Sequence, residues 1–89
     1  MFIIVKVYIL ETGDYMLKAI RTNKGYSQSE LAEISSVNIR MIQHYEQGYK
    51  DINNAKLDTL LSLSIALECG VSDLLTSEDL KNKCGRAKL

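Results

Sequence analysis

The spacing of apolar residues changes once along the chain, near residue 14. From Phe2 to Leu10 the chain is rich in Ile, Val and Tyr and holds a single Lys, a composition that is typical of a β-strand. After Thr12-Gly13-Asp14 the apolar residues recur at helical spacing instead. The pattern therefore predicts an all-α domain over residues 14–76, preceded by a strand-like extension over residues 1–13. That extension is expected to be either a dimerisation element or an upstream addition to the folded core.

Two short amphipathic helices with a tight turn between them are predicted within residues 27–48. Ser27 is a good N-cap, and Glu30 three residues later completes a capping box. Ser36 lies in the turn, Asn38 can cap the second helix, and a glycine at position 48 ends it. This arrangement is a helix-turn-helix, a motif whose second helix can enter the major groove of DNA.

Further helices are predicted on both sides of this motif. One begins near Asp14 and ends at Lys24-Gly25. A leucine-rich helix follows the motif and closes at Gly70, and Asn53 or Asn54 could cap its start. A short helix is expected around residues 72–75. Residues 77–89 are expected to form a tail or a short helix that is frayed from Cys84 onward.

The chain resembles the Cro/C1-type helix-turn-helix domains, also called the Xre family, of bacterial and phage regulators. The resemblance covers about residues 15–76, and the matching positions are spread over all the predicted helices of this region: Leu17, Ile20, Arg21, Ser27-Gln28-Ser29-Glu30-Leu31-Ala32, Val37, Ile42, Tyr45, Glu46, Gly48, Leu57, Leu60, Leu61, Ala66, Leu67, Val71 and Leu74-Leu75. It implies a compact five-helix bundle of the lambda-repressor type. Ser36 stands where the family usually has Gly, so an unfavourable backbone conformation is expected there.

The second helix of the motif carries side chains that suit base recognition. Arg40 can donate two hydrogen bonds to guanine, and Gln43 can make a bidentate contact with adenine. Ile39 could meet a thymine methyl group, and His44 can donate or accept according to its protonation. The resemblance places the family's base-reading positions on Ile39, Arg40 and His44, with Gln43 beside them. The alternative is that this face is merely polar and solvated.

Phosphate contacts are expected at both ends of the motif. In the family, the position of Gln28 binds a phosphate through its side chain and the helix N-terminus together. The other candidates are polar or basic residues near the ends of the second helix: Asn38, Gln47, Tyr49 and Lys50. The resemblance also pairs Arg21 with Glu46 across the bundle, as a structural ion pair that does not read DNA.

Charge is unevenly divided along a chain whose formal net charge is zero. Residues 15–50 hold five basic and three acidic side chains, whereas residues 51–76 hold one basic and four acidic ones. The zero total excludes a general polycation, but it allows a local DNA-binding face. Cys69 and Cys84 are in no metal-binding or redox spacing and are expected to be reduced thiols. The apolar run at the N-terminus is too short to span a bilayer.

These patterns predict a sequence-specific DNA-binding transcriptional regulator, a repressor in its simplest form, that binds a palindromic operator as a homodimer. We expect no enzymatic activity, no cofactor, no metal and no membrane partner, and a cytoplasmic protein of bacterial or phage origin. Two alternatives stay open. One is an antitoxin that regulates its own promoter and has a protein partner. The other is a protein-interaction module with the same bundle and no DNA binding. Ile65 occupies a usually polar position of the family and could mark a dimer surface.

Overall fold

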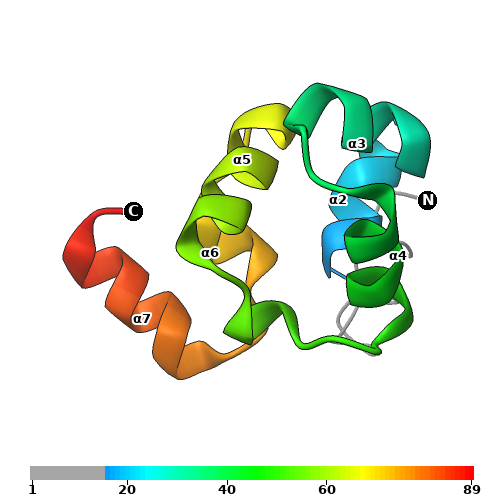
Figure 1. Ribbon diagram of the computed structural model, residues 1–89. Coiled ribbons are helices and arrows are strands. Elements are labelled where there is room, and N and C mark those ends of the chain that lie inside the picture. Colours follow the sequence, from blue (N-terminus) through cyan, green and yellow to red (C-terminus); the bar gives the residue numbers. More distant parts are fainter. Residues whose placement is uncertain (1–15) are drawn as a thin grey trace.

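The computed structural model describes residues 16–89 (Figure 1). The strand-like extension predicted for residues 1–13 lies outside the described residues. Within residues 16–89 the chain forms six α-helices and one short 3-10 helix, in the order α2 (Met16–Asn23), α3 (Gln28–Ser35), α4 (Ile39–Gln47), η1 (Ile52–Asn54), α5 (Leu57–Leu67), α6 (Val71–Leu74) and α7 (Glu78–Ala87).

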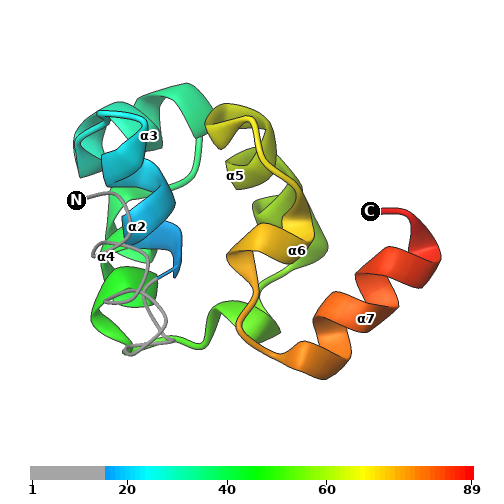
Figure 2. The same cartoon turned by 180° about the vertical axis from the view of Figure 1, so that it is seen from behind.

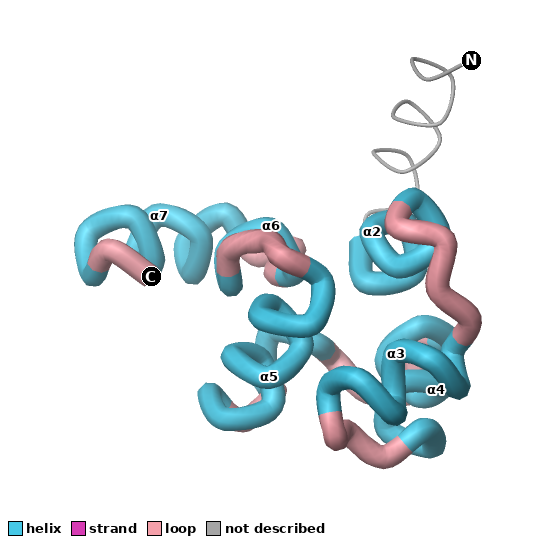
Figure 3. The backbone as a smooth tube through the Cα atoms, turned by 90° about the horizontal axis from the view of Figure 1, so that it is seen from above, coloured by secondary structure: helices cyan, strands magenta, loops and turns pink. Residues whose placement is uncertain are grey.

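Helices α2 to α6 form the five-helix bundle that the sequence predicts, and α7 is added at one side. α3 packs on both α4 and α5, and α2 contacts α4 and α6. α7 packs on α6, at the side of the molecule away from α3 and α4 (Figures 1 and 2). The view from above shows the same separation between α7 and the α3–α4 pair (Figure 3). The all-α bundle is confirmed.

The core is built mainly from leucines, and most helices contribute to it. The most deeply buried side chains are Leu31, Ile42, Leu63, Leu67 and Leu74. Burying one such side chain stabilises the folded state by roughly 1.5–3 kcal/mol. Cys84 of α7 belongs to the same cluster and is only 7% exposed. The expectation of fraying from Cys84 is therefore wrong, because this buried thiol holds the last turns of α7 against the bundle.

The predicted caps of the two motif helices are confirmed. The Ser27 hydroxyl accepts a hydrogen bond from the Glu30 amide at 3.0 Å, and the Glu30 carboxylate accepts one from the Ser27 amide at 2.8 Å. The Asn38 side chain caps α4 by accepting from the Arg40 amide at 2.7 Å. Ser36 has the left-handed backbone that was expected to be unfavourable, with φ of 62°. Together these features fix the start and end of α3 and the start of α4.

The cap predicted for α5 is wrong. Asn53 and Asn54 lie in the 3-10 helix, and Lys56 precedes α5 without a side-chain cap. The reason is that Asn53 is engaged elsewhere. Its carbonyl oxygen accepts from the backbone amides of Thr76 and Ser77 at 2.9 Å each, and its amide nitrogen donates to the Thr76 hydroxyl at 2.7 Å. Asn53 therefore ties the loop after α4 to the connection between α6 and α7.

Candidate nucleic-acid interface

The turn between α3 and α4 is held by local contacts that set the direction of α4. The Ser35 hydroxyl accepts a hydrogen bond from the Val37 amide at 3.1 Å, and Ser36 makes the left-handed bend. Val37 is half-buried against the core. Because both ends of this turn are anchored, α4 is presented to solvent in one orientation relative to α3.

One face of α4 is buried, and the other carries the residues predicted to read bases. Ile42, Tyr45 and Glu46 are buried. Met41 is half-buried against the core. The other five positions lie on one side of the helix: Ile39, Arg40 and Gln47 are exposed, and Gln43 and His44 are half-buried. The structure therefore brings the predicted base-reading residues together on one outward face.

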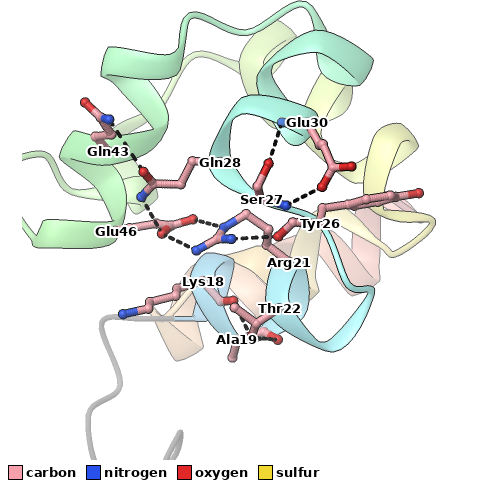
Figure 4. A network of polar contacts seen from close by, with 10 residues as sticks. All are labelled: Lys18, Ala19, Arg21, Thr22, Tyr26, Ser27, Gln28, Glu30, Gln43 and Glu46. Atoms are coloured by element: carbon pink, nitrogen blue, oxygen red, sulfur yellow. Dashed lines mark hydrogen bonds and ion pairs between the residues drawn. The ribbon is translucent and has the colours of Figure 1, made fainter.

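A chain of polar contacts connects this face to the interior (Figure 4). The Arg21 guanidinium donates to both carboxylate oxygens of Glu46, through Nε at 2.6 Å and Nη2 at 2.9 Å, and through Nη1 to the Tyr26 carbonyl at 2.7 Å. Gln28 Nε2 donates to Glu46 Oε1 at 3.0 Å, and Gln43 Nε2 donates to Gln28 Oε1 at 3.5 Å. The network spans α2, α3 and α4.

Chemistry fixes the direction of each amide in this chain. A carboxylate that is paired with arginine can only accept, so Gln28 must turn its nitrogen toward Glu46. The side-chain oxygen of Gln28 then faces Gln43. Only the amide nitrogen of Gln43 can donate a hydrogen bond to that oxygen. Gln43 retains its oxygen and one N–H for other partners. Those two groups match the N6 donor and N7 acceptor of adenine.

Sequence reasoning missed this connection between Gln28, Gln43 and the buried pair. It treated Gln28 as a phosphate ligand and placed Arg21 and Glu46 in a separate structural role. One feature of the sequence pointed to part of this connection. Gln43 and Glu46 are three residues apart, so they are neighbours on the surface of one helix. The position of Gln28 relative to them follows from the crossing of α3 and α4, which spacing alone does not give.

The end of α4 adds an aromatic contact to the same surface. Gly48 has φ of 81° and ends the helix. The ring of Tyr49 then stands edge-on to the ring of His44, with 5.8 Å between the centroids and 76° between the planes. Tyr49 is 75% exposed, and Lys50 is exposed beside it in the chain. Tyr49 therefore restricts the His44 ring while leaving its own hydroxyl end accessible.

The burial of Glu46 leaves the exposed face of α4 without a negative charge. α4 contains one carboxylate, that of Glu46, and its side chain is 2% exposed and paired with Arg21. The exposed charged residues from Asn38 to Lys50 are therefore basic, namely Arg40 and Lys50. Lys24, in contrast, is engaged with Glu68 at 3.0 Å. A chain of zero net charge thus presents a local face suited to a phosphate backbone.

Residues 16–89 contain no group of three or more His, Cys, Asp or Glu side chains that could hold a metal ion. Their helices are all too short or too polar to cross a membrane.

Comparison with known proteins agrees with the geometry of α3 and α4. The family described as Helix-turn-helix matches residues 17–74, which is more than half of the chain. That match runs from α2 to the end of α6 and leaves α7 outside. No curated protein and no solved structure matches the chain. The chain belongs to the Cro/C1-type helix-turn-helix family.

Proposed function

We propose that this protein is a sequence-specific transcriptional regulator, acting as a repressor, that binds a palindromic operator as a homodimer. Membership of a DNA-binding helix-turn-helix family supports DNA as the partner. The observation that carries the proposal is the outward face of α4, on which polar and basic side chains are exposed while the only carboxylate of that helix is buried against Arg21.

The proposed contacts divide into base reading and phosphate binding. Arg40 donates to guanine, and Gln43 recognises adenine with the amide groups that the Gln28 contact leaves free. Ile39 meets a thymine methyl group, and His44 completes the base-reading set. The flanking groups would hold the phosphate backbone and fix the register: Gln28, Asn38, Gln47, Tyr49 and Lys50. The half-sites of the operator would lie roughly 10 bp apart.

Selection from a random duplex library at physiological salt tests base reading. We expect the wild type to enrich a palindromic motif. Arg40→Ala and His44→Ala should each lose information at particular positions of that motif, because each removes a base contact. Arg86→Ala is the matched control, since Arg86 is also an exposed arginine but lies on α7. Absence of enrichment by the folded protein would contradict the proposal.

Salt dependence separates operator binding from a protein-interaction module. Binding to DNA releases counterions, so the affinity should fall steeply with salt concentration. Lys50→Ala should reduce the logarithmic salt slope by about 1, as expected for one lost phosphate contact. Lys83→Ala, another exposed lysine, should leave the slope unchanged. Equal slopes for wild type and Lys50→Ala would remove Lys50 from the phosphate-binding set.

A further inference from the structure

A hollow lies beside α7, and one of its walls is outside the part of the chain that matches the helix-turn-helix family. The walls come from the first turn of α5, from α6 with the residue that ends it, and from α7. The volume of this α7 hollow is about 240 Å³, and all of its lining residues except Asn53 and Lys83 are apolar. Concave, mostly apolar sites with a few polar groups are where proteins bind small molecules.

The packing of α7 holds the hollow open. At the start of α7 the Ser77 hydroxyl accepts a hydrogen bond from the Leu80 amide at 3.3 Å. One turn later Cys84 is buried in the core. Ala87 follows on the same side of the helix and lines the hollow, but its methyl group fills little of the space. The hollow is therefore part of the folded structure and does not have to form when a ligand arrives.

Two leucines of the hollow leave much apolar surface in water. Leu57 of α5 is 55% exposed, and Leu89 after α7 is 50% exposed. Leu60 and Leu75, in contrast, are wall residues that belong to the core. An apolar group in the hollow would contact the core leucines and cover the exposed ones. Removing that surface from water favours binding.

The volume restricts the apolar group to a small one. An apolar cavity of about 150 Å³ in another protein binds benzene. By the same measure, the hollow has space for roughly eight carbon atoms, as a chain or as a ring with a short side chain. A helix of a partner protein, with a diameter of about 10 Å, is too wide for it.

Only one polar side chain of the hollow is available to a ligand. The Asn53 amide has two N–H donors and two acceptor sites, and all four are used. Its nitrogen donates to Asp51 Oδ1 at 2.9 Å and to the Thr76 hydroxyl at 2.7 Å, and its oxygen accepts from the Thr76 and Ser77 amides at 2.9 Å each. The polar end of a ligand must therefore lie at Lys83.

Lys83 gives the hollow a positive charge, and none of the lining residues is acidic. Its Nζ lies 3.4 Å from a carboxylate oxygen of Asp79, but these two side chains are 60% and 75% exposed. An exposed pair of this kind contributes little to stability, so Lys83 can pair with a ligand carboxylate instead. Its alkyl part can lie along the apolar wall while the ammonium stays in water. The charge therefore favours an anion over a neutral or cationic ligand of the same shape.

We propose that the α7 hollow binds a small carboxylate whose apolar chain or ring has about eight carbons. The carboxylate pairs with Lys83, and the apolar part lies against Leu57, Leu60 and Leu75. This contact involves no DNA, so the proposal goes beyond the proposed function. It can be measured on the free protein, and its failure is distinguishable from a failure to bind DNA.

Titration of the full, isotope-labelled chain with octanoate, followed by two-dimensional NMR without DNA, tests the site. We expect saturable shifts that are largest for backbone amides around the hollow, including Leu57, Leu80 and Ala87, with a dissociation constant below about 1 mM. Octylammonium has the same chain with the opposite charge, and octanol has the same chain with no charge. Both should bind at least about threefold more weakly, because neither can form an ion pair with Lys83.

Two variants test the two parts of the contact. Ala87→Phe places a ring in the hollow and should weaken octanoate binding at least about tenfold, since a filled space has no room for the chain. Arg86→Phe is its control, because position 86 does not line the hollow. Lys83→Gln should weaken octanoate binding about threefold and leave octanol binding unchanged, and Lys81→Gln on the same helix is the control. Positions 83, 86 and 87 are exposed, so the fold should be kept, and circular dichroism checks this.

Several results would overturn the proposal. Octanoate that shifts no amide saturably, or that shifts chiefly the amides of α4, would show that the hollow is not its site. Octylammonium or octanol that binds as tightly as octanoate would exclude selection by charge, as would unweakened octanoate binding in Lys83→Gln. Equal octanoate affinities for Ala87→Phe and Arg86→Phe would exclude binding of the chain inside the hollow.

Discussion

Replacing Glu46 by alanine should destabilise the fold strongly, although this residue lies on the helix that is proposed to read DNA. The substitution removes the partner of two hydrogen bonds from Arg21 and one from Gln28. The Arg21 guanidinium would keep only its contact with the Tyr26 carbonyl. A buried cation without a counter-charge is the main source of the expected cost.

The magnitude follows from the burial of the pair. The side chains of Arg21 and Glu46 are 9% and 2% exposed, so solvent does little to compensate either charge. Breaking one side of such a buried pair costs about 3–5 kcal/mol. A chain of this length has an unfolding free energy on the order of 4–13 kcal/mol. Glu46→Ala should therefore remove a large share of the total stability.

Urea unfolding followed by far-UV circular dichroism measures this effect. At a slope near 1 kcal/mol per molar, a loss of about 3 kcal/mol lowers the midpoint by about 3 M. Arg21→Met should cost a similar amount because it leaves the carboxylate unpaired. The double variant Arg21→Met with Glu46→Ala removes both charges, and its loss of unfolding free energy should be clearly smaller than the sum of the two single losses.

Two results would refute this reasoning. A loss of less than about 1 kcal/mol in each single variant would mean that the pair behaves like an exposed surface ion pair. Additive losses in the double variant would mean that the two side chains contribute independently, without the coupling that a shared buried contact requires.

Three further predictions concern backbone strain, capping and pH. Ser36→Gly should raise the free energy of unfolding by about 1 kcal/mol, since φ at this residue is 62° and glycine takes this conformation without steric cost; a lower melting temperature would contradict it. Ser27→Ala should lower the free energy of unfolding by about 1 kcal/mol by removing the cap of α3, whereas Ser29→Ala, on an exposed position of the same helix, should change it little. Burial raises the pKa of Tyr45 above 10.0, so the folded state holds this proton more tightly than the unfolded state, and stability should fall as the pH rises above about 10. Tyr45→Phe should show a shallower fall in urea titrations across that range, and an unchanged profile would contradict the assignment.

The parts of the fold that sequence reasoning predicted are those that neighbouring residues determine. The capping box of Ser27 and the cap at Asn38 depend on groups within three positions. The inward face of α4 follows from helical periodicity alone. The role of Asn53 could not be found this way, because its partners lie 23 and 24 residues further along the chain. The order of α7 also depends on a distant contact, the burial of Cys84 in the core formed by other helices.

At the candidate site, too, the sequence predicts local features but not contacts between distant residues. This affects how variants of the site should be interpreted. Periodicity identified the outward residues of α4, whereas the connection from Arg21 through Glu46 and Gln28 to Gln43 depends on how three helices cross. Through that connection, the orientation of the Gln43 amide on the surface depends on the buried pair of Arg21 and Glu46. A variant of Glu46 would lose DNA binding through unfolding and through a misplaced Gln43 amide, without any lost contact to DNA. Loss of binding in such a variant is therefore no evidence that Glu46 touches a base. Gln43→Ala removes the amide that is proposed to read a base and leaves the buried pair intact, so this change isolates the contribution of position 43 to DNA binding.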